Sequence, residues 1–176
     1  MTPLSLALIQ AQTPLSSKQI RSSAILSIVK KTLPLLKEYR NNGLVFYDNL
    51  CANNPLGVSF AFFGHDFSGC YGIDNTDSQI KYITKEDDEI RIIFCNTTIE
   101  KFHYFNNLFM DLIQEKITSN PNNFESKITE LRKIYSAKDF LAMECEESFW
   151  SIRLYELEED FFPLDDSKIN LYSKHQ

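Results

Sequence analysis

The chain has 176 residues, of which 43 % are apolar and 13 % aromatic, so it can bury a conventional core and is not globally disordered. Its net charge of −6 disfavours direct binding to the phosphate backbone of nucleic acids. A basic protein, or a basic groove on one, is the more suitable partner. The length predicts one domain, residues 1–176.

The N-terminal stretch "MTPLSLALIQAQ" has a short apolar run without a basic flank, which is too short for a signal-peptide core or a membrane span. The cysteines, Cys51, Cys70, Cys95 and Cys145, are widely spaced and form no C-x-x-C pair. A chain of this size does not need disulfides, so we expect buried free thiols; two disulfides remain the alternative. These features predict a cytoplasmic protein without a membrane partner.

The first predicted helical region covers residues 16–40. Ser16 and Gln19 have the spacing of a capping box at its start. Pro34 should end or kink the helix near Thr32, because proline lacks an amide hydrogen and crowds the preceding turn.

Between residues 44 and 95 the apolar period changes to two, which predicts strands. The expected strands are "LVFYD", "VSFAFF", "CYGID", "IKYIT" and "IRIIFC". Short polar turns such as "KEDDE" separate them. The pattern therefore predicts an antiparallel meander sheet of about five to six strands.

Residues 97–162 carry helical patterns, and residues 163–176 resemble a frayed tail. The clearest helix begins with a capping box of Thr97 and Glu100. The last helix has an apolar stripe formed by Trp150, Leu154, Leu157 and Phe161. Together the elements predict an α+β fold, with an N-terminal helix, a helical C-terminal third and the helices packed on one face of the sheet.

His65, Asp66 and Cys70 are the first candidates for chemistry. A cysteine nucleophile needs a base within hydrogen-bond reach. Adjacent strand residues point to opposite faces, so Asp66 cannot easily orient His65, and cysteine is often a small buried hydrophobe. We therefore expect no catalytic residue and no enzyme; the alternative is a small cysteine-dependent hydrolase that uses Cys70 and His65.

Other site chemistries find little support. The histidines His65, His103 and His175 are far apart and form no H-x-x-x-H pair, so no metal site is expected. No G-x-x-x-x-G-K loop is present to cradle a phosphate. Carboxylates in "KEDDE" are typical of a solvated hairpin turn. The sequence thus predicts no metal and no cofactor.

The C-terminal third is strongly acidic. Ten carboxylates lie between Asp139 and Asp166 against one basic residue, Arg153, an excess larger than the net charge of the whole chain. This excess indicates either a solvated helix face or a docking surface for a basic partner. The candidate partner-binding residues are Glu86, Asp87 and Asp88 of the "KEDDE" turn, and Glu144, Glu147, Glu156, Glu159 and Asp160. Of these, Glu156, Glu159 and Asp160 are expected on the outer side of the last helix.

Three stretches, "FFGHDFSGCYGID", "IRIIFCNTTIEKFHYFNNLF" and "MECEESFWSIRLYELEEDF", together resemble the SUKH superfamily of bacterial immunity proteins. They are similar to its strand–turn–strand, its last strand leading into an N-S/T-S/T cap, and a C-terminal Ser-Phe-Trp helix. The N-terminal third lacks the usual Gly/Pro-containing entry to the first strand.

This resemblance implies a non-catalytic protein that binds and neutralises a cognate polymorphic or contact-dependent toxin domain by blocking its active site. The expected toxin is a nuclease, although deaminases are also targets in such systems. A regulatory protein-binding scaffold with the same fold is the remaining alternative.

Overall fold

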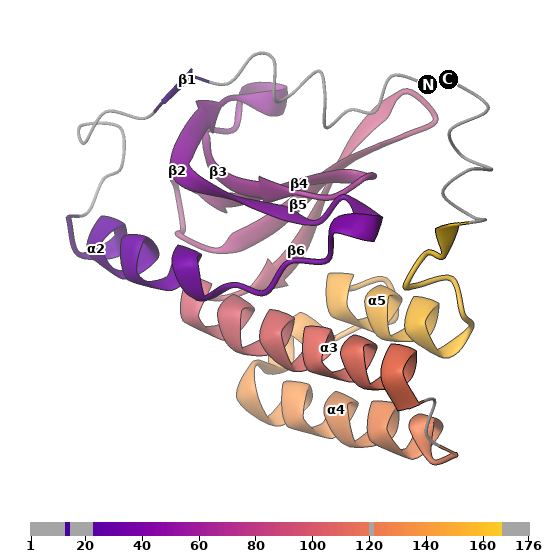
Figure 1. The fold of residues 1–176 in the computed structure, drawn as a ribbon. Helices are drawn as coiled ribbons and strands as arrows, with labels where there is room; N and C mark the ends of the chain where they lie inside the picture. The colour runs from indigo at the N-terminus through magenta and orange to yellow at the C-terminus, as the bar shows by residue number, and fades with distance from the viewer. Residues whose placement is uncertain (1–12, 15–22, 120–121, 167–176) are drawn as a thin grey trace.

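The computed structural model describes residues 13–14, 23–119 and 122–166. It has an α+β fold in which helices cover one face of an antiparallel sheet (Figure 1), as the sequence predicts. The strands follow one another in the sheet in chain order, which is the expected meander. None of the described helices is both long and apolar enough to cross a membrane.

The strands are β1 (Thr13–Pro14), β2 (Val45–Asn53), β3 (Phe60–His65), β4 (Gly69–Asp74), β5 (Ile80–Glu86) and β6 (Glu89–Asn96). Each strand pairs antiparallel with its neighbours. At the β5–β6 turn Asp87 and Asp88 have positive φ angles of 47° and 69°. Tight hairpin turns of this handedness fit the right-handed twist of the strands.

The helices are α2 (Ser23–Thr32), α3 (Ile99–Ser119), α4 (Phe124–Lys138) and α5 (Phe149–Glu158). Short 3₁₀ turns are η1 (Leu33–Leu35), η2 (Arg40–Asn42), η3 (Pro55–Gly57) and η4 (Phe140–Met143). The helix α2 ends at Thr32, before Pro34, as predicted. The predicted capping box of Ser16 and Gln19 lies outside the described residues.

The prediction of helix up to residue 40 is wrong for the segment that follows η1. Leu36 is extended, and two asparagines of α3 satisfy the backbone there. Asn107 Nδ2 donates to the carbonyl of Leu35 (2.8 Å), and the amide of Lys37 donates to Asn107 Oδ1 (3.0 Å). Asn106 Nδ2 donates to the carbonyl of Lys37 (3.0 Å). These bonds replace those that a continued helix would form.

The capping box predicted from Thr97 and Glu100 is also wrong. The cap is Thr98, whose Oγ1 accepts a hydrogen bond from the amide of Lys101 (3.3 Å). The Thr97 hydroxyl lies instead beside Asp139, at 3.2 Å from its carboxylate.

The end of α5 differs from the predicted stripe. Trp150, Leu154 and Leu157 are buried as expected, but Phe161 is 60 % exposed and Phe162 is buried in its place. The helix ends at Glu158, and the positive φ of Asp160 turns the chain, which breaks the helical spacing. The amide of Leu164 donates to Asn42 Oδ1 (3.2 Å), so the chain is still held to the fold after residue 163, where the frayed tail was predicted to begin. Residues 167–176 are not among the described residues.

Both faces of the central strands are buried. Ala61 and Phe63 join the main core with the helices, whereas Phe60, Phe62 and Cys70 belong to a second apolar cluster formed by strand residues. Alternation along β3 places these two sets on opposite faces. The glycines Gly64 and Gly69 do not have positive φ. They allow close approach, because a Cβ atom on Gly69 would lie 2.4 Å from the carbonyl oxygen of Ile83.

Candidate functional site

A buried carboxylate, Asp66, lies directly after β3, at the turn into β4. Its oxygens accept hydrogen bonds from the amides of Ser68 (2.9 Å) and Gly69 (2.8 Å). The hydroxyls of Tyr71 (2.8 Å) and Tyr82 (2.5 Å) also donate to it. Burial, and then the charge of Asp66, raise the pKa of both tyrosines well above the usual value, so both remain hydrogen-bond donors.

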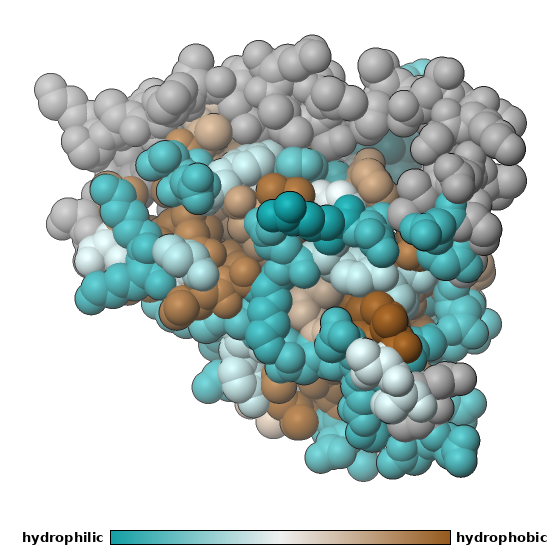
Figure 2. Space-filling model, viewed as in Figure 1, coloured by the Kyte–Doolittle hydropathy of each residue, from teal (hydrophilic) through white to brown (hydrophobic). Residues whose placement is uncertain are grey.

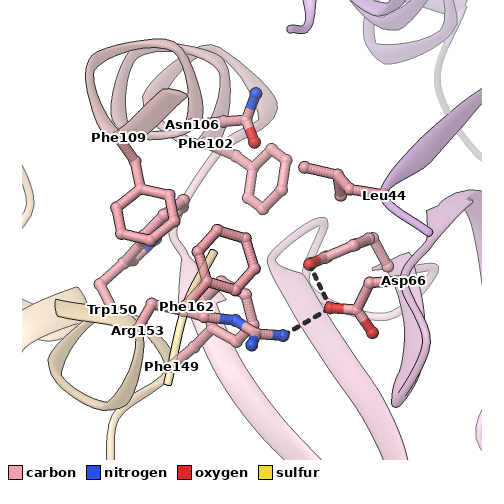
Figure 3. Close-up of a pocket in the computed structure, with 10 residues that line it drawn as sticks. Leu44, Asp66, Phe102, Asn106, Phe109, Phe149, Trp150, Arg153 and Phe162 are labelled. Carbon is pink, nitrogen blue, oxygen red and sulfur yellow. Dashed lines mark hydrogen bonds and ion pairs between the residues drawn. The ribbon is translucent and has the colours of Figure 1, made fainter. Parts of the chain in front are cut away.

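Arg153 projects from α5 toward Asp66 and forms a buried ion pair with it (Figure 3). Its guanidinium lies among aromatic rings, 5.2 Å from the centroid of Phe149 and 5.7 Å from that of Phe162. A second donor of the guanidinium reaches Glu156 (2.8 Å). Planar guanidinium groups suit such stacked, paired environments.

The hollow beside this ion pair is small. The cavity has a volume of about 20 Å³ and lies between Asp66, Arg153 and apolar side chains of α3 and α5 (Figure 3). A buried water needs at least roughly 10–15 Å³ by the same measure. The space is too small for a metabolite. The Asp66–Arg153 ion pair, called the clamp below, links α5 to the turn between β3 and β4.

His65 and Cys70 face each other across β3 and β4, as direct register partners. Cys70 is fully buried, and burial, reinforced by Asp66, raises its pKa to about 12. His65 Nδ1 lies 3.0 Å from the hydroxyl of Tyr47. Because the thiolate is the nucleophilic form, this environment leaves Cys70 unreactive near neutral pH.

The exposure of the thiols gives a direct test. Cys145 is exposed and Cys51 is half-buried, contrary to the expectation of buried thiols, whereas Cys70 and Cys95 are buried. We expect Cys145 to react rapidly with a disulfide reagent such as DTNB in the native protein, and Cys70 to react roughly a thousandfold more slowly. The substitution Cys145→Ser should remove the fast phase. A fast phase that instead disappears in Cys70→Ala would contradict the burial.

His65 should make stability depend on pH. Burial lowers its pKa below the ordinary 6.5, against the opposing charges of Asp66 and Glu38. Below pH 6.5 the unfolded chain therefore binds a proton that the native protein binds less readily, and stability falls as pH falls toward the native pKa. We expect a shallower fall of the free energy of unfolding below pH 6.5 in His65→Gln, measured by urea titration. His103→Gln on α3 is the control; identical slopes for wild type and His65→Gln would contradict the assignment.

The acidic hairpin residues are partly neutralised. Glu86 pairs with Arg91 across the hairpin, and Asp88 pairs with Lys85. Asp87 is exposed and makes no ion pair with any described residue.

Some acidic residues around α5 also form ion pairs, whereas others do not. Glu156 pairs with Arg153 and Asp160 with Lys116. Glu159 is exposed, without an ion pair to a described residue. The predicted common helix face of Glu156, Glu159 and Asp160 is wrong, because α5 ends at Glu158.

The carboxylates between η4 and α5 remain the most available. Glu144, Glu146 and Glu147 are all exposed, and none makes an ion pair with a described residue. Glu86 first, and then Glu147, raise the pKa of Arg91. Two sequence-predicted residues from distant segments, Glu86 and Glu147, thus lie near the same cation.

Asp139, counted among the acidic surface residues, is buried instead. Its carboxylate accepts hydrogen bonds from the amide of Thr97 (2.9 Å) and from Asn96 Nδ2 (3.2 Å), and it pairs with Lys101 (3.3 Å). Asn96 Oδ1 in turn accepts from Trp150 Nε1 (2.7 Å). This network joins the end of β6 to α3, η4 and α5.

Sequence reasoning missed Arg153 as an internal ion-pair partner. A signal was present, because Arg153 is the lone basic residue in a strongly acidic stretch and lies four positions after Phe149 in a helical pattern. Among the described residues, no group of three or more His, Cys, Asp or Glu side chains is placed to hold a metal ion.

Comparison with known proteins finds no match. No family model, no curated protein and no solved structure is significantly similar to this chain. The resemblance to the SUKH superfamily therefore depends on the three sequence stretches alone.

Proposed function

We propose that this chain is a cytoplasmic immunity protein, without enzymatic activity, that binds a basic toxin domain and blocks its active site. The observation that carries the proposal is that Arg153 is paired in the protein interior and does not face solvent. It is the lone basic residue between Asp139 and Asp166, and it is held inside by Asp66. With Arg153 largely buried, no cation of this stretch faces solvent, and the exposed carboxylates Glu144, Glu146 and Glu159 make no ion pair with a described residue.

A nuclease is the toxin that this surface would suit best. An enzyme that acts on nucleic acid needs a positively charged groove for the phosphate backbone. Carboxylates on a rigid protein compete for that groove, and their long-range attraction raises the rate of association. The resemblance to immunity proteins supports the same class of partner.

Co-expression with the protein encoded immediately upstream tests the proposal. We expect that protein alone to arrest growth, and co-expression to restore growth and to yield a stable complex. The association rate should fall steeply as salt is raised, because screening weakens the attraction between opposite surfaces. Failure to protect and to form a complex would refute the proposal.

The alternatives give different results in the same system. A cysteine-dependent hydrolase would lose turnover in Cys70→Ala, yet the burial of this thiol disfavours that function. A regulatory scaffold would bind a partner whose expression alone does not stop growth.

A further inference from the structure

Two large apolar side chains are exposed side by side on η4. Phe140 is 67 % exposed and Leu141 is 46 % exposed, whereas the next residue, Ala142, is fully buried. In the view of Figure 2, the coloured surface is largely hydrophilic with smaller hydrophobic patches. Single exposed apolar residues are common on protein surfaces, whereas contiguous apolar surface with a polar rim marks interaction sites, so this adjacent pair is a candidate for one.

The segment that carries this pair is fixed at both ends. Asp139 holds its start through the hydrogen bonds to Asn96 and Thr97. At its end the amide of Ser148 donates to the carbonyl of Cys145 (3.1 Å), and the Ser148 hydroxyl donates to that of Ser151 (2.9 Å). Because the backbone is already ordered, binding through this segment would lose little conformational entropy.

Carboxylates border the apolar pair on its C-terminal side. Glu144, Glu146 and Glu147 are exposed there. The cation that precedes the pair, Lys138, lies over the ring of Tyr104 (5.3 Å). An apolar anchor with a charged rim has the composition of a protein–protein interface, in which the anchor supplies affinity and the rim selects the partner.

We propose that residues 140–147, the docking segment, insert Phe140 and Leu141 into an apolar pocket of a basic partner, while Glu144, Glu146 and Glu147 face lysines or arginines around that pocket. This inference rests on the proposed function and names its contact surface. A second copy of the chain is a poor occupant, because it carries the same carboxylates and the same net charge of −6.

The test measures binding kinetics with the protein encoded immediately upstream. The double variant Phe140→Ser/Leu141→Ser should weaken binding roughly a hundredfold, mainly through faster dissociation. The triple variant Glu144→Gln/Glu146→Gln/Glu147→Gln should slow association about tenfold at low salt and flatten its salt dependence. Near-ultraviolet circular dichroism would verify that each variant keeps the native fold.

The matched control removes the same number of exposed carboxylates from β2 and α4, as Asp48→Asn/Glu125→Gln/Glu130→Gln, and should change binding by less than about twofold. If wild type binds and protects but the docking-segment variants bind equally well, the docking segment is wrong and the proposed function stands. If wild type neither binds nor protects, the proposed function fails and this inference fails with it. A wild-type dimer that the Phe140/Leu141 variant dissolves would also overturn the assignment to a basic partner.

Discussion

The substitution Asp66→Asn is expected to lower the free energy of unfolding by about 3–5 kcal/mol. The carboxylate is the only described ion-pair partner of Arg153 apart from Glu156, and both members of the Asp66–Arg153 pair are largely buried. Removal of the negative charge leaves a guanidinium in an apolar, aromatic environment without its main counter-charge. Denaturant unfolding of the purified protein measures the effect.

Two further variants separate the buried charge from the loss of contacts. Arg153→Met alone should also lower the free energy of unfolding. The double variant Asp66→Asn/Arg153→Met should lower it by less than the sum of the two single effects, because neither charge is then buried without its partner. Asp111→Asn is the matched control, since Asp111 forms a surface ion pair with Lys37 and should lose at most about 1 kcal/mol. A loss below about 1 kcal/mol for Asp66→Asn would show that the clamp does not stabilise α5 on the sheet.

Removal of the second buried carboxylate, in Asp139→Ala, is expected to cost about 2–3 kcal/mol. The amide of Thr97 and the side-chain amide of Asn96 would lose their acceptor, and Lys101 would lose its counter-charge. Buried donors without acceptors are costly because they have left water without a substitute. Denaturant unfolding measures the loss of stability.

The same variant should loosen the docking segment. Amide hydrogen exchange should accelerate in residues 140–147 more than in β3 and β4, because Asp139 holds the start of that segment. Glu146→Gln, an exposed change in the segment, is the control and should stay within about 0.5 kcal/mol of wild type. Unchanged exchange in residues 140–147 of Asp139→Ala would show that the segment is held by other contacts, Ala142 first among them.

Local patterns were enough to predict strands β2–β6 of the sheet, although not the short edge strand β1. Alternating apolar residues and tight polar turns specify strands that pair with their chain neighbours, and β2–β6 cover almost the predicted range of 44–95. Pro34 likewise predicts the end of α2 at Thr32, because its effect acts on the preceding turn. Such features depend on residues only a few positions apart.

The candidate site was only partly predictable. Glu144 and Glu147 are exposed as expected, but Phe140 and Leu141 gave no signal, because apolar residues are expected inside. The spacing of Glu156 and Glu159 predicted a shared helix face, but a turn that the pattern does not mark ends α5 between them.

The sequence by itself determined the α+β fold class, the meander order of β2–β6 and the excess of negative charge. Only the tertiary structure decided which charges face solvent. Asp66 and Arg153 are 87 positions apart and Lys101 and Asp139 are 38 apart, so no periodic pattern could reveal that these charges are paired around buried carboxylates. A carboxylate has the same formal charge wherever it lies, but its attraction for a partner depends on whether a cation and the protein interior have already enclosed it.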